Sequence, residues 1–305
     1  LGVTGAATAD SFGATTSTST PIIDITRTTV PSAPSSAVRF FCREIALKQV
    51  PAFIGNSGLS LSVQSSLAHN RIAIWAPPGN TTTTAPGLFG MLALTSAGTA
   101  AVRNLSAGNM IARMRRIGYN TTVTPGTVAG LRSPSAQYTT GDGFGLGGFT
   151  FIYRFGFAQV NDTERAFVGC QASTAAPTNV EPSTLVNCCG VGKGTADTNL
   201  KLCYGGTSAQ TPIDLGPLFP LDAATANTNA YELILFSPST AIGTINWQVT
   251  RLNTGDTATG QITGDATVVP TSSVLLTALN AYVTNNAAAA LVSMDMVSLY
   301  TETDV

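Results

Sequence analysis

The sequence predicts an all-β protein: an antiparallel β-sandwich, or jelly roll, with an irregular N-terminal arm. In FTFIYRFGF, residues 149–157, aromatic residues recur at every second position, as expected for a strand with one buried face. Further short apolar runs are separated by turn residues, and helical periodicity is almost absent, which favours a sandwich over a helical fold. The residues on the buried face of the first strand are Phe149, Phe151, Tyr153, Phe155 and Phe157.

Other strands are predicted from short runs bounded by Gly, Pro, Asn or Asp. The segment 245–263 reads as a hairpin that turns at Asn253 to Asp256, with Ile245, Trp247 and Val249 on one face. The remaining predicted strands are 71–75, 166–171, 186–192, 200–204, 231–236 and 291–301, and the run 87–95 is a weaker candidate.

Three regions are predicted along the chain. Residues 1–37 contain a low-complexity tract of Thr, Ser and Ala that cannot bury enough apolar surface to fold alone, so we expect an attachment arm or a flexible linker. Residues 38–118 are predicted to form a small β-rich neck and residues 119–305 a jelly-roll head. Within the neck, NMIARMRRIG fits two structures. It is either a two-turn helix that begins after Asn109 and ends at Gly118, with Met110, Met114 and Ile117 on one face, or a strand.

The composition gives no reason to expect a nucleic-acid or membrane partner. Only 10% of the residues are charged and the formal net charge is −1, so the chain has no long-range field for nucleic acid or an anionic membrane. No stretch approaches the roughly 20 apolar residues of a membrane helix, and residues 1–10 lack the pattern of a signal peptide. We therefore expect no nucleic-acid partner and no membrane insertion.

The five cysteines form an odd set without CxxC spacing. Cys188 and Cys189 are adjacent, so on a strand they point to opposite faces and do not both reach one metal ion. We expect free thiols that act as small core residues, as in a protein assembled in a reducing cytoplasm, with one disulfide as the alternative. The set is Cys42, Cys170, Cys188, Cys189 and Cys203.

No catalytic, cofactor-binding or metal-binding residue is assigned. A Ser-His-Asp or Cys-His nucleophile needs a histidine base, and His69 is the only histidine. Glycoside cleavage needs two carboxylates about 5 to 9.5 Å apart in a sugar-binding groove, and no groove signature accompanies the scattered acids. We expect no enzyme and no cofactor. The acids considered are Asp162, Glu164, Glu181, Asp214 and Glu232.

Two glycine-rich segments imitate phosphate-binding motifs. Residues 143–148 satisfy GxGxxG but precede a predicted strand, whereas the dinucleotide motif follows one, so this segment is predicted to be a flexible loop. Residues 190–195 resemble a P-loop, yet Asn187 stands in place of its first Gly and Gly194 in place of its Ser or Thr.

Two side-chain groups have competing interpretations. The aromatic row of 149–157 and Trp247 are interpreted as core, with a sugar-stacking platform as the alternative. Arg113, Arg115 and Arg116 are interpreted as a solvated face or a subunit contact rather than a nucleic-acid patch.

Several segments resemble the C-terminal part of tailed-bacteriophage tail-fibre or virion-fibre proteins, with the likeness densest after residue 146. These segments are LGGFTFIYRFGF (146–157), RAFVGCQAST (165–174), EPSTLVNCCGVGKGTADTNLKLCYGG (181–206), YELILFSP (231–238), VTRLNTGDTATG (249–260) and DMVSLYTETDV (295–305). The resemblance implies a concanavalin-like jelly-roll head on a homotrimeric receptor-binding fibre. It brings no catalytic motif, so no site residue is carried over. Cys188, Cys189 and Cys203 depart from the apolar residues expected there, which adds a little weight to the disulfide alternative, with free thiols still expected.

The function expected from the resemblance is that of a structural virion subunit. Its arm would bind other virion proteins, and its surface loops would bind a glycan or protein on the host cell. The ligand-binding residues are unassigned. The alternatives are a capsid or neck decoration protein, a polysaccharide-degrading tailspike and a carbohydrate-binding module.

Overall fold

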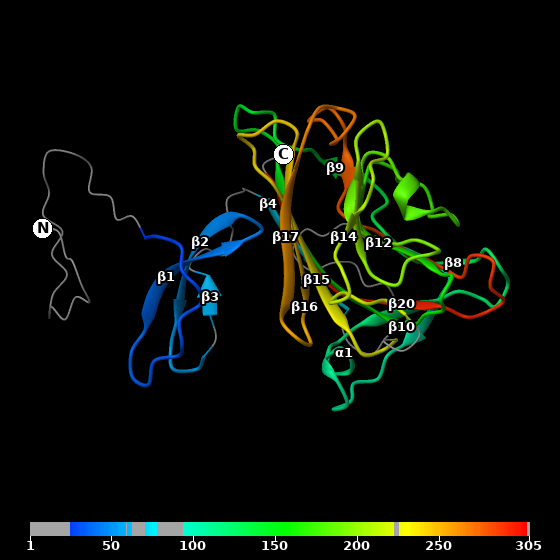
Figure 1. The fold of residues 1–305 in the computed structure, drawn as a ribbon, viewed down its shortest axis with the longest axis horizontal. Helices are drawn as coiled ribbons and strands as arrows, with labels where there is room; N and C mark the ends of the chain where they lie inside the picture. Colours follow the sequence, from blue (N-terminus) through cyan, green and yellow to red (C-terminus); the bar gives the residue numbers. More distant parts are fainter. Residues whose placement is uncertain (1–24, 59, 63–70, 78–93, 223–225, 304–305) are drawn as a thin grey trace, which may run out of the picture. The chain divides into compact units, whose positions relative to one another are not determined.

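The computed structural model describes residues 25–58, 60–62, 71–77, 94–222 and 226–303 (Figure 1). His69, most of the predicted strand 87–95 and the tract 1–24 lie outside these ranges. Among the described residues, no helix has the length and hydrophobicity needed to span a bilayer.

The chain divides into two units, the smaller of residues 1–44 and 49–63 and the larger of residues 45–48 and 64–305. The division predicted at residues 37/38 and 118/119 differs from this one. Its second boundary falls inside strand β7 (Ile117–Asn120), which pairs with the last strand, β20 (Ser293–Thr303). Because the pairing partner lies near the far end of the sequence, no local signal shows that β7 belongs to the sandwich.

The smaller unit contains a three-stranded sheet in the order β1 (Arg39–Ile45), β2 (Lys48–Ile54) and β3 (Ser60–Ser62). Its hydrophobic cluster consists of Phe41, Ala52 and Ile54. Phe41 and Cys42 of β1 are both buried, whereas Phe40 is about half exposed.

The larger unit is a sandwich of two antiparallel sheets, which confirms the predicted fold class. We call them sheet B and sheet C. Figure 1 shows β15, β16 and β17 of sheet B on one side and β12 and β14 of sheet C on the other. Sheet B has the order β17 (Asp256–Thr263), β16 (Thr244–Arg251), β15 (Ala230–Ser237), β10 (Phe149–Gln159), β20, β7 and β6 (Thr99–Val102), with β4 (Arg71–Trp75) also paired to β20. Sheet C has the order β14 (Ile213–Asp214), β13 (Lys201–Gly205), β12 (Cys188–Lys193), β11 (Arg165–Gln171), β19 (Asn280–Thr284), β8 (Val128–Arg132) and β5 (Thr95–Ala97).

The chain winds between the two sheets as in a jelly roll. It crosses from β5 to β6, from β7 to β8, from β10 to β11, from β14 to β15 and from β19 to β20, and it also changes sheet between β8 and β10 and between β17 and β19. The centre of each sheet therefore pairs an early strand with a late one, β10 with β20 and β11 with β19. A two-stranded ribbon of β9 (Ala136–Tyr138) and β18 (Leu276–Thr277) accompanies them.

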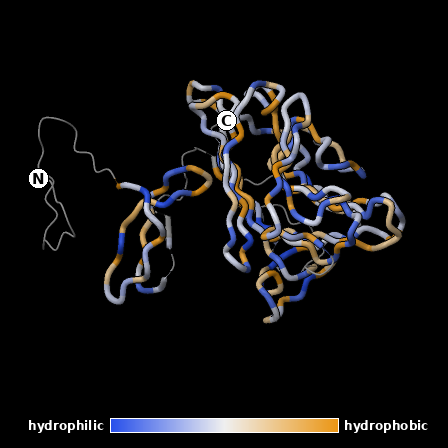
Figure 2. Tube along the Cα trace, in the orientation of Figure 1, coloured by the Kyte–Doolittle hydropathy of each residue, from blue (hydrophilic) through white to orange (hydrophobic). Residues whose placement is uncertain are grey.

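The predicted aromatic row lies in the core between the sheets. The five aromatic residues at alternate positions from Phe149 to Phe157 are each at most 3% exposed. Phe149 and Phe151 stack with ring centroids 4.3 Å apart, and the Tyr153 hydroxyl donates to the Ala278 carbonyl at 2.8 Å. Figure 2 shows hydrophobic and hydrophilic stretches alternating along the sandwich strands. The core interpretation of this row is therefore confirmed.

The predicted hairpin of β16 and β17 is also present. Arg251 pairs with Asp256, and the amides of Thr254 and Gly255 both donate to the Arg251 carbonyl. Trp247 is 5% exposed in the core and lies against Gly260, where a Cβ atom would be 2.6 Å from the indole ring. Trp247 is thus a core residue and not a surface platform.

The run 109–118 combines both predicted structures. Asn109 caps a single turn, α1 (Met110–Arg113), with its side chain accepting from the Ala112 amide at 2.9 Å, and β7 follows. The helical face is not the predicted one: Ile111 is buried against Gly156, whereas Met110 is 38% exposed. One turn is too short for the predicted periodicity to decide which side chain faces the sheet.

Candidate functional site

Three of the five candidate carboxylates are held in ion pairs with basic residues, and Asp162 is exposed. Arg154 Nε lies 2.7 Å from Glu232 Oε2, Arg165 Nε lies 2.7 Å from Glu181 Oε2, and Lys193 Nζ lies 3.5 Å from Glu164 Oε1. Asp214 is exposed on edge strand β14. In the part of the chain that the structure describes, no group of three His, Cys, Asp or Glu side chains could hold a metal ion.

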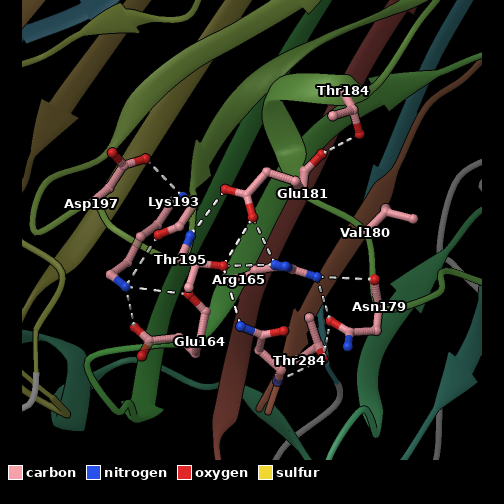
Figure 3. A network of polar contacts seen from close by, with 12 residues as sticks. Glu164, Arg165, Asn179, Val180, Glu181, Thr184, Lys193, Thr195, Asp197 and Thr284 are labelled. Carbon is pink, nitrogen blue, oxygen red and sulfur yellow. Dashed lines mark hydrogen bonds and ion pairs between the residues drawn. The ribbon is translucent and has the colours of Figure 1, made fainter.

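The densest polar network lies at one end of sheet C (Figure 3). Its innermost part is the pair of Glu164 and Lys193, both at most 1% exposed. Lys193 Nζ also faces the backbone carbonyls of Asp162, Glu164 and Gly194 at 3.3 to 3.5 Å. Burial raises the pKa of the Glu164 carboxyl, and the Lys193 ammonium partly offsets this rise. An ammonium group that faces carbonyls on several sides is a structural cation and not a phosphate ligand.

The outer part of the network pins residues 172–187, here called the strap, onto the outer face of sheet C. Glu181 accepts from the Thr195 amide at 3.0 Å, and Arg165 Nη1 donates to the Asn179 carbonyl at 3.1 Å (Figure 3). The strap contains the one-turn 3-10 helix Pro182–Thr184. Val180 and Leu185 of the strap pack on a second hydrophobic cluster made by Phe167, Cys188, Cys203 and Tyr282. The network therefore covers this face and offers no open catalytic groove.

The three arginines 113, 115 and 116 do not form one basic patch. Arg116 is buried, and its Nε lies 2.8 Å from Asp295 Oδ2, while Arg103 Nε lies 2.8 Å from the other oxygen, Oδ1. Arg113 donates to the Ala107 carbonyl instead. The prediction of a solvated arginine face was wrong for Arg116, because a carboxylate from β20 meets it on the outer face of sheet B.

Arg103 approaches Asp295 over a glycine. A Cβ atom at Gly118 would lie 2.5 Å from Arg103 Nε, so the absence of a side chain here lets the guanidinium lie directly on the sheet. Arg103 also donates to Asn120 Oδ1 at 3.1 Å and to the Ser293 hydroxyl. Asp295 itself is fully buried.

The cysteines of sheet C are distributed over both of its faces. Cys170 and Cys189 face the main core, and Cys188 and Cys203 face the strap. All five thiols are buried and unpaired. Burial raises the pKa of Cys170 and of Cys203 to about 12 and also raises the pKa of Cys188 and Cys189.

We expect the four thiols of sheet C to be unreactive in the native protein, because the thiolate is the reactive form and burial suppresses it. A thiol probe at pH 8 should label the folded protein far more slowly than an unstructured cysteine peptide. After denaturation without reductant, three or more sites should react. Labelling of one site or none under those conditions would show that the cysteines are paired.

The GxGxxG segment is a loop, as predicted, but it is not a loosely held one. Residues 141–148 connect β9 to β10, and Asp142 Oδ1 accepts from the amides of Phe144 and Leu146 at 2.8 and 3.1 Å. The Ser239 carbonyl accepts from Gly143 and Gly145 at 3.1 and 3.3 Å. These bonds tie the loop to itself and to the connection between β15 and β16. The glycines at 143, 145, 147 and 148 all have positive φ.

This loop displays apolar side chains to solvent. Phe144 is 91% exposed, Leu146 65% and Ile242, from the neighbouring connection, 67%. Ile242 lies against the loop, since a Cβ atom at Gly143 would be 2.9 Å from its Cγ1. We call these three residues the apolar tip. The Phe and Leu residues of GFGLGG could have indicated an exposed apolar site. The segment was interpreted only as a flexible loop, so this site was not predicted.

Comparisons with known proteins give no family. No protein-family model matches the chain, and no curated protein matches it. Among solved structures, a protein of unknown function from Shewanella oneidensis MR-1 is 9% identical with a TM-score of 0.48, over 79% of this chain and 90% of that one. Peanut lectin with a 9mer peptide is 12% identical with a TM-score of 0.48, over 77% and 98%. Lectin II from Ulex europaeus is 11% identical with a TM-score of 0.44, over 70% and 93%. At these values the likenesses assign neither a family nor a ligand.

Proposed function

We propose that this chain is a non-enzymatic attachment protein, a fibre subunit of a tailed bacteriophage that contacts the host surface through loops of its sandwich. The observation that carries the proposal is the apolar tip. Exposing Phe144, Leu146 and Ile242 to water lowers solubility and contributes nothing to folding, so a partner that covers them is the physical reason to retain them. The resemblance of residues 146–305 to virion-fibre proteins supplies the setting.

The described polar groups support binding rather than catalysis. Glu164, Glu181 and Glu232 are each neutralised by a basic partner, and Lys193 is enclosed by carbonyls. A general acid or base needs a proton-transfer path to substrate, which the enclosed pair of Glu164 and Lys193 lacks.

Purified virions provide the direct test. Mass spectrometry should find the chain at a fixed copy number, and the purified protein should compete with the phage for adsorption to its host. Incubation with host envelope should release no reducing sugar. Absence of the chain from virions would refute the fibre assignment. Release of oligosaccharides that stops on substitution of one carboxylate would show a polysaccharide-degrading tailspike instead. A copy number typical of the shell or neck, without competition for adsorption, would show a decoration protein.

We further propose that the chain assembles as a homotrimer, with arm residues 1–37 binding other virion proteins. The low charge content of 10% leaves much of the surface neutral, which suits subunit packing. Light scattering of the purified full chain should give three times the chain mass of 31.2 kDa. A monomer that persists across micromolar concentrations would contradict the trimer but would not affect the proposal that the apolar tip binds a partner.

A further inference from the structure

We infer that the apolar tip binds a protein surface with an apolar recess, rather than a glycan or a lipid bilayer. This inference rests on the proposed attachment function and names the chemistry of its target. Three features support it: the fixed shape of the loop, the use of its polar groups within the protein, and the absence of basic residues from the three segments that meet at the tip.

The protruding shape is fixed by glycine. A Cβ atom at Gly147 would lie 2.6 Å from Thr139 Oγ1, and one at Gly148 would lie 2.6 Å from the Ser237 carbonyl. At Gly141 the distance to the Pro238 carbonyl would be 1.9 Å. The loop thus packs against its neighbours more closely than any other residue allows, and Phe144 stands at its apex. A preformed apex loses little conformational entropy when it enters a recess.

The polar groups of the loop are used within the protein. Asp142 Oδ1 accepts from two amides of the loop, the Ser239 carbonyl accepts from two more, and Gly141 N donates to the Ser237 hydroxyl. Sugar sites instead direct several convergent donors and acceptors at the ligand hydroxyls. The tip presents an aromatic ring and two aliphatic side chains, without such a set beside them.

The three segments that form the tip and its immediate contacts carry no positive charge. The segments 133–148, 237–243 and 264–275 meet at this end of the sandwich, where Gly264 N donates to the Gly243 carbonyl and Thr140 Oγ1 donates to the Pro270 carbonyl. None of the three segments contains Lys or Arg. Surface binding to anionic bilayers draws on such residues. A rigid tip whose exposed side chains are one aromatic and two aliphatic groups fits the buried centre of a protein interface, where aromatic residues are enriched.

Adsorption of the fluorescently labelled full chain to a panel of bacterial strains, with matched variants, tests this. Phe144→Ala should weaken adsorption about 30-fold or more, as loss of an interface anchor does. Leu218→Ala is the control, because Leu218 is an apolar residue that is 56% exposed and distant from the tip. Its carbonyl accepts a hydrogen bond from Arg251, which lies at the end of β16 opposite the tip. Asp142→Asn keeps the oxygen that holds the loop and removes the charge. Leu218→Ala should stay within about threefold of the parent, Asp142→Asn shows whether the charge of the loop contributes to binding, and all three variants should keep the parent melting temperature.

Treatment of the cells before adsorption shows whether the target is a protein, a glycan or a lipid. Mild protease treatment of the cells should abolish adsorption, periodate oxidation of their glycans should leave it intact, and vesicles of phosphatidylethanolamine and phosphatidylglycerol should bind no protein. Adsorption that survives protease but is lost after periodate or with Asp142→Asn would overturn the inference in favour of a glycan, and vesicle binding would overturn it in favour of lipid. Parent adsorption that Phe144→Ala leaves unchanged would refute the role of the tip while the attachment function stands. Adsorption to no strain, including the host of a phage that carries the chain, would remove the attachment function and this inference together.

Discussion

Replacing Asp295 with alanine is expected to lower the free energy of unfolding by about 3 to 5 kcal/mol, the cost of leaving a buried charge without its partner. The Asp295 side chain is fully buried, and the side chains of Arg116 and Arg103 are only 4% and 17% exposed. Without the carboxylate, two guanidinium groups repel each other where water reaches them poorly. The loss of unfolding free energy for Asp295→Ala should lie toward the lower end of this range, because Arg103 keeps some access to solvent.

An exposed ion pair on the same sheet provides the matched control. Arg154 and Glu232 lie on neighbouring strands, with side chains 50% and 14% exposed. Glu232→Gln should cost at most about 1 kcal/mol, since solvent screens such pairs. Urea unfolding of both variants measures the difference. Equal, small losses for Asp295→Ala and Glu232→Gln would show that the Asp295 cluster is open to water.

The second large effect is expected at Trp247. Trp247→Ala should cost about 3 to 5 kcal/mol through the cavity that it leaves between the sheets. Trp247→Phe should cost clearly less, because the ring volume is largely kept and the indole Nε1 has no hydrogen-bond partner among the described residues. Thermal and urea unfolding of the two variants would give the comparison.

Adsorption separates this core role from a binding role. Trp247→Ala should lose adsorption only to the extent that it unfolds, whereas Phe144→Ala should lose adsorption while remaining folded. A Trp247→Ala protein with the parent melting temperature and no adsorption would place the indole in a binding surface and refute the core assignment.

The local sequence pattern was sufficient to predict the strands that have one face in the core and one face toward solvent. The alternation in 149–157 predicted the five aromatic side chains of β10 that face the core, and the turn residues 253–256 predicted the hairpin of β16 and β17. These features repeat over a few residues, so they are legible without knowledge of the partner strands. Strand β19 escaped prediction, because all five of its residues are buried and it shows no alternation.

The candidate site was much less predictable. GFGLGG has the composition of a flexible linker, and its rigidity comes from Ser239, which lies far away in the sequence. Arg116 belongs by composition to a basic surface run, yet it is buried because Asp295 of the last strand meets it. In both cases the deciding partner is brought in by a crossover between strands distant in the chain.

The sequence by itself determined that this is a low-charge, all-β protein with an aromatic inner face, because side-chain alternation and composition are properties of short segments and of the whole chain. Only the tertiary structure decided the order of the strands, the burial of the Asp295 cluster and the display of Phe144, Leu146 and Ile242. The physical reason is that exposure and charge pairing depend on which segments meet in space. In a jelly roll the segments that meet are mostly those that are far apart along the chain.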